Sequence, residues 1–182
     1  MKKTRLSRSD WIFAGFTALA QDGPASLKAE PLARRLSATK GSFYWHFRDV
    51  SHFHDAMLDF WETRAVTDII KDLDRIDDPR ERLRQLAQIA TAPVDEINDG
   101  QPAEPAIRAW ARSDPKVQIV LNRVDERRLD YLGTQLDQAG LSPEPYARMI
   151  YAQLIGLEGL SIGQQDNPRT LSRLVEFILS LG

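Results

Sequence analysis

The sequence predicts an all-α fold of about nine helices. Apolar residues recur at spacings of three and four along nearly the whole chain, which is the period of an amphipathic helix. No stretch shows alternating β-branched residues between hairpin turns, so nothing favours a strand. The periodic stretches are separated by Pro, Gly, Asn and Asp, which end helices. These observations predict a fold built from helices alone.

The first three helices are expected to be short and closely spaced. Ser9 or Asp10 can cap the first helix, and the break around Gly23 ends it. In the second helix Pro31 falls in the first turn, where its missing N–H breaks no helical hydrogen bond. Thr39 can cap the third helix. The expected ranges are 10–20, 29–36 and 39–47.

Longer helices are expected to follow. Asp49 or Ser51 can cap a long fourth helix, with Phe53 facing inward. Residues 93–105 are rich in Pro, Gly, Asn and Asp, so we expect a loop there. A short helix after this loop ends at Ser113-Asp114-Pro115. The expected ranges are 51–73, 79–92, 106–112, 116–138, 143–163 and 168–181.

The composition excludes several classes of protein. The chain has 182 residues, 42% hydrophobic and 27% charged, which suits one large globular domain or two small ones. It has no cysteine, which excludes disulfides, thiolate metal sites and cysteine catalysis. No apolar stretch is long enough for a signal peptide or a membrane span. We therefore expect a cytoplasmic protein with no membrane partner.

Charge is distributed unevenly along the chain. Residues 1–50 carry nine Lys and Arg against four Asp and Glu, a net charge of +5. The whole chain has a net charge of −2, so the remainder carries −7. A basic N-terminal part suggests a module that binds a polyanion. The alternative is that these cations only keep the end of the chain soluble.

The stretch TKGSFYWHFRD, residues 39–49, contains five rings in succession. Phe43 and Phe47 lie four apart on one helix face and can anchor this helix on apolar residues of the first two helices. These anchors are expected at Ile12, Phe16 and Leu32. Three short helices with a tight link before the third are the outline of a helix-turn-helix, whose third helix enters the DNA major groove.

The other side chains of this stretch fall on outward faces of the third helix. Lys40 is a donor to phosphate or guanine, and hydroxyl groups at Ser42 and Tyr44 are donors to phosphate. Gly41 has no side chain to hold the backbone away from DNA. Trp45 can press on a thymine methyl or a sugar, or it can instead cover the junction with the first helix.

The stretch ARRLSATKGSFYWHF, from Ala33 to Phe47, resembles the signature of the TetR (tetracycline repressor) family of transcriptional regulators. The likeness covers about residues 8–60. It implies a three-helix DNA-binding head, here residues 1–50, and a helical effector-binding and dimerisation body, here residues 51–182. It also implies a homodimer that binds double-stranded operator DNA and a small-molecule effector.

The motif and the resemblance together give a set of expected DNA contacts. These are Lys28, Thr39, Lys40, Gly41, Ser42, Tyr44, Trp45, His46 and Arg48. The chain also departs from the family pattern. Ala29 and Glu30 stand where the family usually has Thr or Ser and a basic residue. Val50 stands where the family commonly has a Lys that contacts phosphate. The positive charge missing at Val50 could come from Arg48. Ser37 replaces the turn glycine, which is tolerable if its backbone keeps a negative φ.

The last two predicted helices are apolar over more than one face. Gly156, Gly159 and Gly163 would let helices approach closely. We expect a dimer interface in which these two helices and their symmetry mates form a four-helix bundle. The alternative is one larger core within the chain. The expected interface residues are Leu154, Leu157, Leu160, Leu171, Leu174 and Ile178.

Four side chains are expected at an effector site: Trp61, Arg108, Trp110 and Arg112. The short helix that carries the last three lies between two breaks, so it is the element most able to move. Its two arginines lie four apart and could meet an anionic or carbonyl-bearing ligand. The alternative is that both tryptophans are ordinary core and both arginines are solvated. We expect a mainly apolar cavity of roughly a few hundred cubic ångströms within reach of either tryptophan.

The leading functional hypothesis is a dimeric repressor that a small-molecule effector releases from its operator. The runner-up is a helical ligand-binding or partner-binding protein whose head has lost operator recognition. An enzyme is not supported, because no phosphate loop, nucleophile elbow or zinc-protease motif occurs. No cofactor or metal is expected, since His52 and His54 are two apart and point to opposite sides of a helix.

Overall fold

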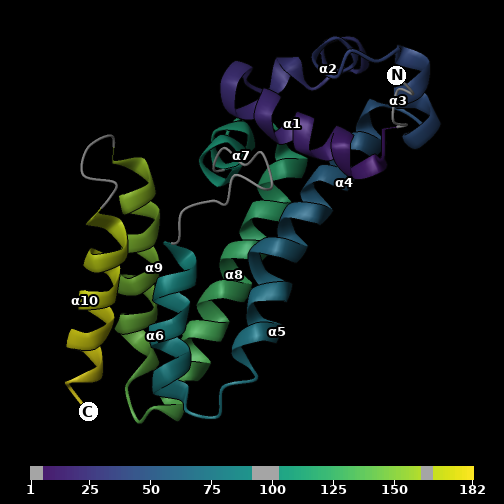
Figure 1. The fold of residues 1–182 in the computed structure, drawn as a ribbon. Coiled ribbons are helices and arrows are strands. Elements are labelled where there is room, and N and C mark those ends of the chain that lie inside the picture. The colour runs from purple at the N-terminus through teal and green to yellow at the C-terminus, as the bar shows by residue number, and fades with distance from the viewer. Residues whose placement is uncertain (1–5, 92–102, 161–165) are drawn as a thin grey trace. The chain divides into compact units, whose positions relative to one another are not determined.

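The computed structural model describes residues 6–91, 103–160 and 166–182 (Figure 1). All regular structure within these residues is helical, which confirms the predicted all-α fold class. The same residues contain no helix long and apolar enough to cross a membrane. They form two compact units, one of residues 6–61 and 103–121 and the other of residues 62–91, 122–160 and 166–182. The functional division at residue 50 stays a prediction, because a compact unit reflects packing and not function.

The first unit contains the N-terminal motif. Its helices are α1 (Arg8–Asp22), the short 3-10 helix η1 (Pro24–Ser26), α2 (Ala29–Arg35), α3 (Lys40–His46), nearly all of α4 (Val50–Glu62), α7 (Ala103–Ala111) and the start of α8 (Pro115–Gln138). The short α2 and α3 follow one another closely, as the helix-turn-helix pattern predicts. Helix α7 begins three residues before its predicted start, and most of the predicted loop 93–105 lies outside the described residues.

Helix α1 begins earlier than predicted because its cap is Ser7. The Ser7 hydroxyl accepts from the backbone N–H of Asp10 at 3.2 Å, and the Asp10 carboxylate accepts from the Ser7 N–H at 2.6 Å. This reciprocal pair is a capping box, so Asp10 acts from the third helical position and not as the cap itself. Helix α1 ends at Gly23, whose φ of 74° is easy only for glycine.

The turn between α2 and α3 differs from the expectation. Ser37 has a φ of 49°, so the condition under which a serine is easily tolerated there, a negative φ, is not met. The backbone here folds back on α2, with the Ala38 N–H donating to the Ala33 carbonyl at 2.8 Å and the Ser37 N–H to the Arg34 carbonyl at 3.1 Å. This turn needs a left-handed residue, and the chain accepts the steric strain of a serine there.

Helices α1 and α4 approach closely in the core of the first unit. A Cβ atom added to Gly15 would lie 2.6 Å from Met57 Sδ and 2.7 Å from Phe53 Cζ, so a side chain there would force these two α4 side chains to move. Phe53 and Met57 are both fully buried at this contact. The close packing fixes α1 and α4 as the platform on which α3 rests.

The second unit is a packed group of helices with one apolar core. Its elements are the π-helical segment η2 (Thr63–Asp68), α5 (Ile69–Leu73), α6 (Pro79–Ala90), most of α8, α9 (Pro143–Gly159) and α10 (Asn167–Leu179). Leu83, Leu136 and Leu171 are at the centre of this core, each at most 1% exposed. Gln135 of α8 is also buried, and its side-chain oxygen accepts from the Arg82 guanidinium at 3.0 Å. The last residues of the predicted helix 143–163 lie outside the described residues.

The predicted long helix 51–73 is interrupted by η2. The helical ladder widens there, and the guanidinium of Arg128 donates to the Ala65 carbonyl at 3.3 Å. Arg127 donates to the Thr67 hydroxyl at 3.1 Å. Arg127 and Arg128 of α8 therefore both bond to the widened turn. The periodicity of the sequence cannot reveal this turn, because it changes the spacing of the apolar residues little.

Candidate nucleic-acid interface

Helix α3 is held in place by two buried rings. Phe43 is 0% exposed and Phe47 is 1% exposed, which confirms that both rings face the core, whereas their predicted contacts with Ile12, Phe16 and Leu32 stay a prediction. The Phe43 ring meets Trp11 edge to face, with 5.4 Å between centroids, and lies 5.3 Å from the ring of Phe53. Phe47 is 4.9 Å from Phe53. Because Trp11 and Phe53 belong to α1 and α4, both helices fix the direction of α3.

The opposite face of α3 is turned to solvent. Tyr44 is 52% exposed and Trp45 is 72% exposed, which is unusual for rings of this size. Gly41 is also exposed, and a Cβ atom there would meet only Thr39 Oγ1 at 3.7 Å, so packing within the chain does not require a glycine. Ser42 is half-buried. Lys40, Gly41, Tyr44 and Trp45 are therefore the accessible members of the predicted outward set, and the backbone at Gly41 is open to close approach.

Thr39 and Lys28 lie at the starts of two neighbouring helices. Thr39 caps α3 as predicted, since its hydroxyl accepts from the Ser42 N–H at 3.2 Å. Lys28 precedes the first residue of α2 and is exposed. The hydroxyl of Thr39 is thus already used within the helix, whereas the ammonium group of Lys28 extends into solvent.

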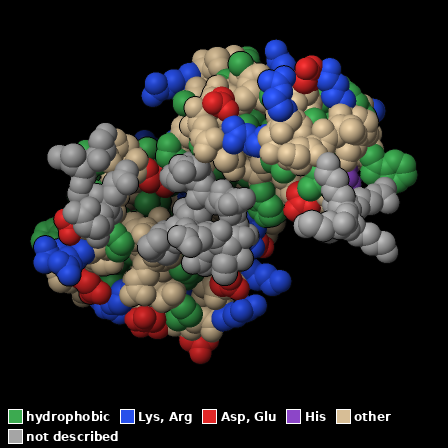
Figure 2. All heavy atoms as spheres, turned by 45° about the horizontal axis from the view of Figure 1, so that its top comes forward, with side chains coloured by type: hydrophobic (Ala, Val, Ile, Leu, Met, Phe, Trp, Pro, Cys, Tyr) green, Lys and Arg blue, Asp and Glu red, His purple; other side chains and the backbone are tan. Residues whose placement is uncertain are grey.

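Basic side chains are interspersed with acidic ones on this unit, as Figure 2 shows for the visible face. Lys40 forms an ion pair with Glu30 at 2.7 Å, and Arg34 lies 3.6 Å from the same carboxylate. A hydrogen bond between the two side chains and their mutual attraction lower the pKa of Glu30 and raise the pKa of Lys40. Both groups are therefore charged at neutral pH. The sequence could not reveal this pair, because Glu30 and Lys40 are ten residues apart on different helices and meet only through the way α2 packs against α3.

The end of α3 bonds to its own chain. His46 is half-buried, and its Nε2 donates to the Leu6 carbonyl at 3.0 Å. Arg48 is exposed and pairs with Asp49 at 3.0 Å. Asp49 caps α4, accepting from the His52 N–H at 2.8 Å, and this bond together with Arg48 lowers the pKa of Asp49. A DNA contact of His46 stays a prediction, since the imidazole already joins the N-terminal segment to α3.

The residues predicted for an effector site all lie in the first unit. Trp61 on α4 is 6% exposed and Trp110 on α7 is 4% exposed. Arg108 pairs with Glu104 on the same helix at 2.8 Å, and Arg112 is exposed. A cavity beside either tryptophan stays a prediction. The structure does describe a pocket of 370 Å³ in the second unit, and none of the four predicted residues lines it.

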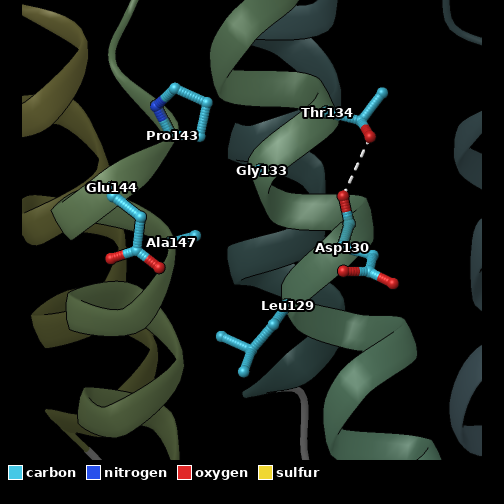
Figure 3. A pocket seen from close by; sticks show the side chains of 7 residues that line it. All are labelled: Leu129, Asp130, Gly133, Thr134, Pro143, Glu144 and Ala147. Carbon is cyan, nitrogen blue, oxygen red and sulfur yellow. Dashed lines mark hydrogen bonds between the residues drawn. The ribbon is translucent and has the colours of Figure 1, made fainter.

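This pocket is a polar groove between α8 and the start of α9. It is lined by Leu129, Asp130, Gly133, Thr134, Pro143, Glu144 and Ala147 (Figure 3). The Thr134 hydroxyl donates to the Asp130 carbonyl at 2.9 Å, which is a bond within α8. Within the described parts of the chain, no three His, Asp or Glu side chains are arranged to hold a metal ion.

The predicted dimer residues fall into two groups. Leu171 and Ile178 are 1% exposed and Leu157 is 8% exposed, so these three belong to the core of the second unit. They have almost no surface left to bury against a second copy. Leu154 and Leu174 pack against this core and are half-buried, while Leu160 is 50% exposed. Met149 and Phe177, which the prediction omitted, are 46% and 61% exposed on α9 and α10.

Comparison with known proteins identifies the fold. The sequence matches no protein-family model and no curated protein. Its structure resembles that of a protein from Rhodococcus sp. described as a TetR-family transcriptional regulator, with a TM-score of 0.76, 24% identity and coverage of 94% of this chain and 98% of that chain. It also resembles SmeT, the repressor of the Stenotrophomonas maltophilia multidrug efflux pump SmeDEF, with a TM-score of 0.69, 21% identity and coverage of 98% and 91%.

A third similar structure contains a small molecule. It is a protein from Saccharomonospora viridis described as a transcriptional regulator in complex with choline, with a TM-score of 0.73, 18% identity and coverage of 93% and 95%. All three likenesses extend over nearly the full length of both chains. The chain therefore has the fold of TetR-family transcriptional regulators.

Proposed function

We propose that this chain is a TetR-family transcriptional regulator that binds operator DNA as a homodimer and is released from it by a small-molecule effector. The main support for this proposal is that α3 has one buried face and one exposed face. Phe43 and Phe47 are buried against α1 and α4, while Tyr44 and Trp45 are more than half exposed on the same short helix. An apolar ring exposed without a functional reason would cost solubility, so this surface suits a partner.

DNA is the partner that best fits the chemistry of this surface. Lys28, Lys40 and Arg48 are exposed cations around α3, and Tyr44 adds a hydroxyl donor. Phosphate oxygens accept from such groups, and the exposed indole of Trp45 can contact a thymine methyl in the major groove. Residues 1–50 act as the DNA-binding head in this proposal, and residues 51–182 as the effector-binding and dimerisation body.

A homodimer would place two such heads on one operator. Met149 and Gly156 are seven residues apart and so lie on one side of α9, Leu160 directly follows the end of that helix, and all three are exposed. Phe177 is the corresponding large exposed ring on α10. We assign the centre of the interface to these side chains, with Leu154 and Leu174 at its edge. A twofold dimer presents two recognition helices about 34–36 Å apart, one turn of B-DNA.

The effector is proposed to act through the body. The choline-bound structure and the efflux-pump repressor, both similar to this chain, support a small molecule as the signal and repression as the output. An effector that binds better to a conformer with the wrong spacing of heads lowers the affinity for DNA by linkage. Trp61, Arg108, Trp110 and Arg112 are proposed to line its site. No step of this proposal is enzymatic, and it requires no cofactor.

Selection of binding sites from random duplexes tests the proposal. Full-length protein should enrich a pseudo-palindrome at physiological salt, with an affinity at least about a thousandfold above that for unrelated DNA. Tyr44→Phe should weaken binding by about three- to tenfold while the melting temperature is unchanged, because only a phosphate donor is lost. Tyr146→Phe, a change of the same kind on α9, is the control. A chain that enriches no sequence would be the helical binding protein with a degenerate head, and not a regulator.

A further inference from the structure

Glu30 and Lys40 place an acceptor and a donor side by side next to the recognition helix. Lys40 is the first residue of α3 and Glu30 lies in the first turn of α2. The ammonium nitrogen and a carboxylate oxygen are 2.7 Å apart, and both side chains are 58% exposed. A pair this exposed stabilises the fold little, so folding alone does not account for an acidic residue here.

A lone carboxylate would be unfavourable at this place. The proposed DNA contacts Lys28, Lys40 and Arg48 lie before α2, at the start of α3 and just after α3, and a negative charge beside Lys40 opposes the approach of phosphates. The pair with Lys40 removes that penalty, because the two groups together carry no net charge. The pKa of Glu30 is lowered and that of Lys40 is raised, so the pair remains ionised at neutral pH.

The pair has the hydrogen-bonding pattern that complements one base pair. In the major groove a G·C pair presents the N7 and O6 acceptors of guanine beside the N4 amino donor of cytosine. A lysine donates to the guanine acceptors, and a glutamate accepts from the cytosine amino group. A donor and an acceptor already 2.7 Å apart can make both contacts at once and keep their own bond.

We propose that Glu30 and Lys40 read a single G·C base pair as a unit, which makes Glu30 a specificity-determining residue. The proposal rests on the proposed function, since it assumes that α3 enters the major groove. It also explains the sequence departure at Glu30. An acidic residue replaces the expected basic one because it reads a base and does not bind phosphate.

Site selection with single and double variants tests the proposal. Full-length wild-type protein, Glu30→Gln, Lys40→Ala and the double variant are each selected against random duplexes. The wild type should fix G·C at one position of each half-site, and Glu30→Gln and Lys40→Ala should both lose the preference at that same position. Glu81→Gln, an exposed substitution of the same kind on α6, is the control and should leave the preference unchanged.

Affinities for two matched duplexes then quantify the effect. Replacing the fixed G·C pair by A·T should weaken wild-type binding by about tenfold or more, which corresponds to about 1.4 kcal/mol. The same replacement should weaken binding of each single variant by less than about threefold, and the double variant should lose no further discrimination. The variants fold normally if their melting temperatures match the wild type.

Two different results would overturn the assignment. If Glu30→Gln changes the affinity for all sequences by one factor and steepens the salt dependence, the pair faces phosphates and not a base. If the two single variants lose preference at different positions, the side chains act separately. A wild-type protein that selects no sequence removes the proposed function itself, which is a distinct outcome.

Discussion

The imidazole of His54 on α4 packs edge-on against the indole of Trp110 on α7, with 5.0 Å between ring centroids and 85° between ring planes. Its Nε2 lies 3.0 Å from the carbonyl oxygen of Leu27, so that nitrogen carries the proton and donates. Leu27 is fully buried just before α2. One side chain therefore joins α7, α4 and the segment that leads into α2.

Two substitutions of His54 should destabilise the first unit to different extents. His54→Phe keeps a ring against Trp110 but leaves the Leu27 carbonyl without its donor, and should lower the free energy of unfolding by about 1 kcal/mol. His54→Ala loses the ring contact as well and should lower it by about 2 kcal/mol. Urea unfolding followed by tryptophan fluorescence measures both. Equal losses in the two variants would mean that the ring contact contributes nothing.

The left-handed backbone at Ser37 predicts an order of stability among small residues. With a φ of 49°, any residue that has a Cβ atom is strained there, whereas glycine is not. Ser37→Gly should be more stable than Ser37→Ala by about 1 kcal/mol, and this comparison cancels the loss of the hydroxyl group. Thermal unfolding of the two variants side by side is the measurement. The reverse order would contradict the turn geometry.

The Glu62 carboxylate at the end of α4 predicts a pH dependence of stability. Its side chain is 14% exposed and pairs with Arg123 and Arg127, one turn apart on α8. The hydrogen bond from Arg123 is the main cause that lowers the pKa of Glu62 from its ordinary value of 4.5. A lowered pKa means that the pair stabilises the fold above about pH 4.5, and that this stability is lost as the pH falls through the lowered value.

Glu62→Gln should therefore be less stable than the wild type at pH 7 by about 1 kcal/mol, since both arginines are partly solvated. The difference should shrink as the pH falls below 4.5 and through the lowered pKa of Glu62. Urea unfolding at several pH values measures it, with Glu126→Gln on the exposed side of α8 as control. A difference that is constant with pH would show that charge is not its source.

The exposed ring of Phe177 predicts where a second copy binds. Phe177→Arg puts a charge into the proposed interface, and an unpaired buried charge costs several kcal/mol, so we expect monomers at micromolar concentration. The ring is 61% exposed within one chain, so the fold itself should persist. Sedimentation velocity gives the assembly state. Ile119→Arg, at a residue 63% exposed on α8, is the matched control and should leave it unchanged. A stable dimer of the Phe177 variant would place the interface elsewhere.

Leu157→Arg and Leu171→Arg would not serve this test. Both side chains belong to the core of the second unit, so an arginine there would disrupt the fold before it affected an interface. The sequence shows that α9 and α10 are apolar on several sides, but it does not show which side the other helices of the same chain cover. Only the packed unit separates the buried leucines from the exposed Met149, Leu160 and Phe177.

The sequence by itself determined the helices and the two faces of α3. Helix period, caps and breakers act within a few residues, so the ranges of α2, α3 and α8 could be predicted closely. The spacing of Phe43 and Phe47 likewise separated anchoring rings from exposed ones. The resemblance to the TetR signature added the fold of the body, where this chain shows no sequence motif of its own.

Only the tertiary structure decided which distant groups meet. Glu30 and Lys40 are ten residues apart on different helices, His54 and Trp110 belong to helices that are distant in the chain, and Leu6 reaches His46 across the first unit. The sequence also did not predict the left-handed backbone at Ser37 or the widened turn η2. The physical reason is the same in each case. Contacts between helices depend on how their faces pack, and local sequence patterns do not contain that information.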